Sequence, residues 1–136
     1  TGDGRVIINL VGVTRFEIIK EIDNKKRYRE FEVSYKNFDV DLVSQDEALI
    51  ERERLKLFKD KAKVFFKKNG LLLNWKEFEK LDQSQQINKL AMIAPVSNEE
   101  KQKLLETKTI IGKTKLMSEI IEFYLHASRV DNKTLQ

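Results

Sequence analysis

At 136 residues the chain has the usual length of one domain and is too short for two domains with separate large cores. Hydrophobic residues make up 40% and charged residues 35%, which is typical of a folded domain with a densely charged surface and argues against wholesale disorder. The absence of cysteine excludes disulfide bonds, thiolate metal ligands and a cysteine nucleophile, whereas the net charge of +4 leaves open a nucleic-acid partner.

The first third of the chain is predicted to form strands. Three runs, residues 5–11, 16–22 and 28–35, are rich in β-branched and aromatic residues, and the third alternates apolar and polar side chains. Residues 23–26 have the composition of a turn, so the second and third runs are expected to form a hairpin. Three strands alone leave open sheet edges, which suggests that earlier strands once covered them. We therefore predict a partial, pseudo-barrel-like antiparallel β lobe over residues 1–43, truncated at its start.

A long helix is predicted next, because the apolar period changes at Ser44 to that of a helix. Ser44 and Glu47 match a capping box, and the helix is expected to continue to about Asn69, with Gly70 as its left-handed stop. Its many lysines are interleaved with acidic residues, which indicates a mixed solvated face rather than a basic stripe. We accordingly expect no nucleic-acid partner.

Four residues that typically begin or end helices indicate the bounds of the next helices. Asn74 opens a short helix, Asp82 caps a third helix that Pro95 ends, and Ser97 begins another capping box. A last helix is predicted over residues 109–127.

The predicted fold class is therefore α+β, with the β lobe followed by a C-terminal helical bundle that contains one long helix. We expect one domain over residues 1–136, composed of the β lobe (1–43), a helical lobe (44–128) and a loose polar tail (129–136).

One tripeptide, Gly112-Lys113-Thr114, copies the end of a phosphate-binding loop. The complete motif needs a glycine at position 107, where this chain has Thr107, and no predicted strand leads into the segment. We therefore expect a glycine near the start of a helix, and no nucleotide or other cofactor.

Residues for hydrolytic chemistry are few. His126 is the single histidine, and it lies near the end of the last predicted helix, where a solvated side chain is expected. Ser118 lies within one turn of Lys115, a spacing that is common by chance on a lysine-rich helix. We predict that the chain is not an enzyme and has neither catalytic residues nor a metal site.

Two stretches carry a resemblance to a known family. Residues 4–18 read GRVIINLVGVTRFEI and resemble the strand–Gly–x–x–Arg–Phe pattern of the N-terminal domain of Lon proteases. Residues 90–106 read LAMIAPVSNEEKQKLLE and resemble the segment that joins the last helices of that domain, most closely in the stand-alone bacterial Lon-domain proteins without ATPase or peptidase. The family's opening Leu-Pro-x-Phe-Pro-Leu type strand has no counterpart here, so about the first third of the usual domain is expected to be missing.

The resemblance implies a non-catalytic module that recognises exposed hydrophobic segments of unfolded or regulatory polypeptides, alone or beside a protease system in protein quality control. Such recognition needs a shallow apolar groove with a polar rim, which we expect between the two lobes. Arg15 and Phe16 are expected to hold the strand lobe together. The residues predicted to contact the partner are Phe38, Phe66, Trp75, Phe78 and Met92.

Two other functions stay open at this point. A related fold in cereblon accompanies a small-molecule-binding module, although that module is bound to zinc through cysteines that this chain lacks. An unrecognised hydrolase that uses Ser118 or a carboxylate pair is the third possibility.

Because no apolar run of 18 residues and no signal-peptide pattern is present, we expect no membrane partner and a cytoplasmic location. The sequence does not predict an oligomeric state.

Overall fold

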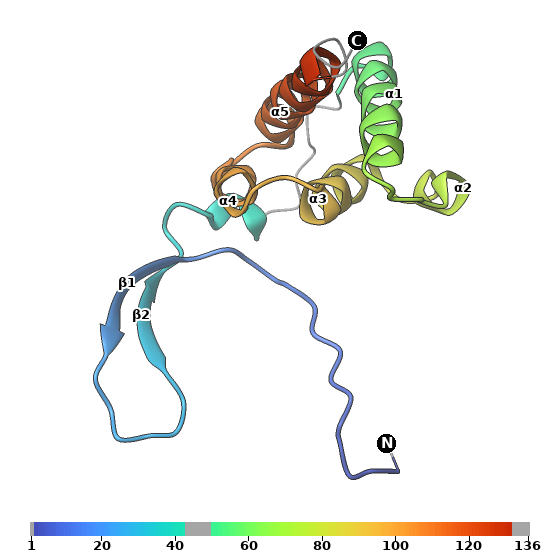
Figure 1. Ribbon diagram of the computed structural model, residues 1–136. Coiled ribbons are helices and arrows are strands. Elements are labelled where there is room, and N and C mark those ends of the chain that lie inside the picture. The colour runs from blue at the N-terminus through green and yellow to red at the C-terminus, as the bar shows by residue number, and fades with distance from the viewer. Residues whose placement is uncertain (1, 43–49, 132–136) are drawn as a thin grey trace. The chain divides into compact units, whose positions relative to one another are not determined.

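The computed structural model describes residues 2–42 and 50–131 and divides the chain into two compact units, Thr1–Asp46 and Glu47–Gln136 (Figure 1). The first unit contains a two-stranded antiparallel sheet, and the second contains five helices. This order confirms the predicted α+β class. The expected groove between the two lobes stays a prediction, and so does the organisation of the chain as a single domain.

The hairpin of the first unit joins β1 (Glu17–Ile22) to β2 (Glu30–Ser34). Its register pairs Glu17 with Ser34 and Ile22 with Glu30 and contains one irregularity between Ile18 and Lys20. Opposite charges face each other across the strands, as in the Lys20–Glu32 pair at 3.1 Å. The predicted hairpin is thereby confirmed.

The prediction of a strand over residues 5–11 is wrong. Residues 5–16 form neither strand nor helix, and six large apolar side chains between positions 6 and 13 are at least 71% exposed. A strand exists only through hydrogen bonds to a neighbouring strand, and no described segment pairs with these residues. β-branched composition alone therefore gave a wrong prediction here, and the described part of the unit forms a hairpin rather than a barrel.

Arg15 connects the start of the hairpin to the 3₁₀ helix η1 (Asp39–Asp41) that follows it. Its Nε and Nη2 donate to the two carboxylate oxygens of Asp41 at 2.8 and 2.7 Å, and its backbone N–H donates to the same carboxylate at 3.0 Å. The guanidinium also lies 4.6 Å from the centroid of the Phe38 ring. These contacts are the ones expected of a residue that holds the strand unit together, and that role of Arg15 stays a prediction. Phe16 is half exposed and packs edge-on against Tyr35.

The helical unit is built from one apolar core that all the longer helices share. The largest side chains that are almost fully excluded from solvent are Phe65, Phe66, Ile87, Leu90, Leu104, Met117 and Ile121. Its elements are α1 (Arg52–Lys68), α2 (Trp75–Phe78), α3 (Gln83–Ile93), α4 (Asn98–Glu106) and α5 (Ile110–Asp131).

Most of the predicted helix caps are confirmed. The side chains of Asn74 and Asp82 accept from backbone N–H groups of α2 and α3, and Ser97 forms the complete capping box of α4. Gly70 has a φ of 73°, the left-handed conformation predicted for the end of α1.

Two helix ends differ from the prediction. The capping box at Ser44 lies outside the described residues, and α1 begins at Arg52 without a side-chain cap at Glu51. The last helix continues to Asp131, four residues beyond the predicted end. Residues 128–131 contain neither glycine nor proline, so nothing in the backbone forces the helix to stop where the apolar side chains become sparse.

Candidate functional site

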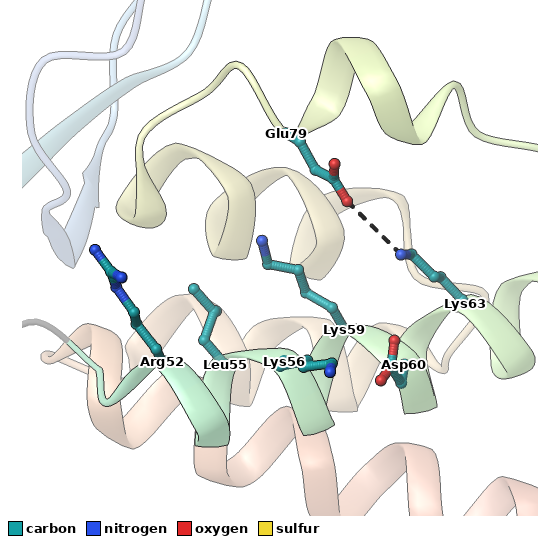
Figure 2. Close-up of a pocket in the computed structure, with 7 residues that line it drawn as sticks. All are labelled: Arg52, Leu55, Lys56, Lys59, Asp60, Lys63 and Glu79. Carbon is teal, nitrogen blue, oxygen red and sulfur yellow. Dashed lines mark ion pairs between the residues drawn. The ribbon is translucent and has the colours of Figure 1, made fainter.

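A shallow pocket of about 330 Å³ lies along one face of α1 in the helical unit (Figure 2). Six of its lining residues come from α1, and the seventh follows α2. They are Arg52, Leu55, Lys56, Lys59, Asp60, Lys63 and Glu79. Figure 2 shows Arg52, Leu55 and Lys59 projecting the same way from α1, while Lys63 reaches toward Glu79.

Positive charges outnumber negative charges in the pocket, because four of its lining side chains are cationic and two, Asp60 and Glu79, are carboxylates. Arg52, Lys56, Lys59 and Lys63 follow the spacing i, i+4, i+7 and i+11, which places them within about 60° of one another around the helix axis. We name this set the cationic stripe. Lys63 lies 3.7 Å from Glu79, whereas no described carboxylate is within ion-pairing distance of the other three cations.

The pocket keeps part of the predicted mix of charges, because Asp60 and Glu79 line it beside the four cations. Along the chain these cations alternate with acidic residues such as Glu53. Because an α-helix has 3.6 residues per turn, Glu53 lies about 100° around the helix axis from Arg52, and it does not line the pocket. Reading the charges in chain order assigned Glu53 to a face where it does not lie, whereas Asp60 does line that face. The signal that would have found the stripe is the helical spacing of the lysines.

Trp75 lies beside this pocket. Lys63 Nζ is 5.2 Å from the centroid of the Trp75 ring, and the Trp75 ring meets Phe78 edge-on at 5.4 Å. The indole is partly exposed, so it adds an apolar surface next to the cations.

Burial divides the five residues predicted to contact a partner. Phe66 and Phe78 are 0% and 8% exposed and belong to the apolar core of the helical unit, so they offer a partner almost no surface. Phe38 of the first unit is 6% exposed and lies against the guanidinium of Arg15. Met92 is 68% exposed on α3, and Trp75 is partly exposed. Binding by any of the five stays a prediction, but only Met92 and Trp75 present side-chain surface.

The other candidate residues are engaged in the helices. Ser118 donates its hydroxyl to the backbone carbonyl of Thr114 at 2.8 Å, so the arrangement of a serine nucleophile paired with Lys115 is not formed. Lys113 is buried, and its Nζ donates to Asn88 Oδ1 at 2.6 Å within the bundle, with Gly112 in the first turn of α5 as predicted.

Among the described residues, no group of three or more histidine, aspartate or glutamate side chains converges as a metal ion would require. No helix in the same residues is both long and apolar enough to cross a bilayer.

The family model of the ATP-dependent protease La (LON) substrate-binding domain matches residues 1–122. No significant match was found among the curated proteins or among the solved structures.

Proposed function

The chain belongs to the ATP-dependent protease La (LON) substrate-binding domain family, and from this premise we propose that it binds exposed hydrophobic segments of unfolded or regulatory polypeptides. The observation that carries the proposal is the extent of the family match, which includes the hairpin and almost all of the helical bundle. The proposed role is that of a non-catalytic module, either alone or beside a protease system in the cytoplasm.

We place the contact surface on the helical unit, at Trp75 with the neighbouring pocket and at Met92. Trp75 offers a large, partly exposed ring with few rotatable bonds, and Met92 offers a polarisable side chain that adapts to differently shaped partners. Leu55 adds apolar surface within a rim of charged groups. A degenerate, weakly selective binding site has these properties, because a few adaptable apolar contacts are surrounded by polar ones.

The test is binding of the chain to a reduced and alkylated, permanently unfolded protein, with the native form of that protein measured in parallel. We expect binding of the unfolded form only. Trp75→Ala combined with Met92→Ala should weaken it about tenfold or more, since each removes an exposed apolar contact. Leu105→Ala on α4 is the control, because Leu105 is an apolar residue that is 52% exposed but lies outside the proposed surface.

A second control addresses the apolar side chains of residues 6–13, which could bind unfolded protein without selectivity. Ile8→Ser with Leu10→Ser should leave the selective binding in place. Loss of binding in this variant, with Trp75→Ala and Met92→Ala unaffected, would refute the proposed surface. Absence of any binding at high micromolar concentration would refute the proposed function.

A further inference from the structure

The cationic stripe on α1 is long enough to contact an extended chain. It runs over 11 residue steps of α1, from Arg52 to Lys63, which at 1.5 Å per residue corresponds to roughly 16 Å. An extended polypeptide rises about 3.3 Å per residue, so about five of its residues would span the same length.

The charges of the stripe act together. Neighbouring members lie one helical turn apart, well within the Debye length of about 8 Å at physiological ionic strength, so their potentials add at the pocket. Lys63 has Glu79 at 3.7 Å, but Arg52, Lys56 and Lys59 have no ion-pair partner among the described residues. Asp60 and Glu79 offset part of the repulsion among the four cations, and an anionic ligand would relieve the rest.

We propose that the cationic stripe selects acidic polypeptide segments, so that the preferred substrate is an extended stretch that combines Asp or Glu residues with an apolar side chain. The carboxylates of the segment would pair with Arg52, Lys56 and Lys59, and its apolar side chain would contact Leu55 or the exposed surface of Trp75. This inference rests on the proposed function, because it names the class of polypeptide that the module takes.

Two carboxylates in the pocket favour a polypeptide over a nucleic acid. Asp60 and Glu79 line the pocket together with the cations. A nucleic-acid strand carries a phosphate on every nucleotide and would bring some of them against these carboxylates. A polypeptide can place a neutral residue at the same points, because its charges are spaced by sequence.

The experiment measures the affinity of the full chain for three labelled probes by fluorescence anisotropy. The first is a peptide of alternating acidic and apolar residues, the second replaces its Asp and Glu with Asn and Gln, and the third is a single-stranded DNA oligonucleotide. The test variant is Arg52→Gln with Lys56→Gln and Lys59→Gln. The matched control removes the same net charge from exposed lysines on α3, α4 and α5, as Lys89→Gln with Lys103→Gln and Lys115→Gln.

We expect the acidic peptide to bind about tenfold more tightly than its amide counterpart, as three exposed ion pairs would give. The test variant should remove that difference, the control should retain it, and raising the salt concentration should reduce it. Far-ultraviolet circular dichroism checks that both variants keep the helical fold.

Two outcomes would overturn the inference while the proposed function stands, and a third would overturn both. If both peptides bind equally, or if the test variant and the control behave alike, the stripe does not select acidic segments while polypeptide binding stands. If the oligonucleotide binds more tightly than the acidic peptide and the test variant loses it, the stripe is a nucleic-acid site. If no peptide and no unfolded protein binds, the proposed function itself fails.

Discussion

Replacing Phe66 with alanine tests whether this aromatic residue belongs to the core or to a binding surface. The ring is fully excluded from solvent and meets Phe65 edge-on at 5.8 Å between centroids. Truncating a buried phenylalanine to alanine costs about 3–5 kcal/mol, because the transfer free energy of the ring is lost and a cavity remains. Met92→Ala is the comparison, since a 68% exposed side chain should change the free energy of unfolding by about 0.5 kcal/mol or less.

Urea unfolding followed by circular dichroism at the helix band measures both effects. With an m value of about 2 kcal/mol per molar urea, the Phe66→Ala cost moves the unfolding midpoint down by about 2 M, whereas Met92→Ala leaves it nearly unchanged. Trp75 is the single tryptophan and lies in the helical unit, so its fluorescence should report the same transition.

The result that would refute this reasoning is a Phe66→Ala protein with an unchanged midpoint and reduced binding of unfolded polypeptide. Such a protein would mean that the ring is exposed in solution and contacts the partner directly. The opposite pattern, in which Met92→Ala shifts the midpoint by 1 M or more, would equally contradict the burial on which the proposed surface depends.

Three further predictions concern single interactions. Ser97→Ala should lower the free energy of unfolding by about 1 kcal/mol, measured by thermal denaturation, because the cap of α4 is lost; an unchanged melting temperature would contradict this. The hydrogen bond to Glu100 is the main cause that raises the pKa of Tyr124 above its ordinary value. The contribution of this hydrogen bond to the free energy of unfolding is therefore complete below about pH 10 and is lost as the pH rises through the pKa of the folded protein. Tyr124→Phe should remove this alkaline dependence of stability. Arg15→Lys should speed amide hydrogen exchange in the hairpin, because lysine cannot form the two-pronged contact with Asp41; unchanged exchange would mean that the contact does not hold the hairpin.

Much of the helical unit could be predicted because its signals are local. A cap depends on one side chain and a backbone N–H three residues later, as at Asp82 and Ser97, and both partners are visible in a short stretch of sequence. The stop at Gly70 is equally local, since it requires only a residue that tolerates a positive φ. The same reasoning explains the hairpin, because only the loop of residues 23–29 separates its two strands in sequence.

The misplaced features depend on partners that are distant in sequence. Residues 5–11 have the composition of a strand, but a strand requires a neighbour, and sequence alone does not identify one. The exposure of an aromatic ring poses the same problem. Phe66 and Trp75 are equally plausible as contact residues by composition, yet packing between helices buries the first completely and leaves the second partly exposed.

The charged residues of α1 could have been placed with the same helical repeat that predicts its buried face. The same 3.6-residue repeat that directs Phe58, Phe65 and Phe66 into the core determines where every lysine of the helix lies. Applied to the apolar residues alone, the repeat predicts the buried face. Applied to the charges, it separates Lys56 and Lys59 from Glu53 and leaves a face whose cations have few partners. A stripe of this kind contributes little to stability, because its members repel one another, so its presence beside a partly exposed tryptophan is better explained by an acidic ligand than by folding.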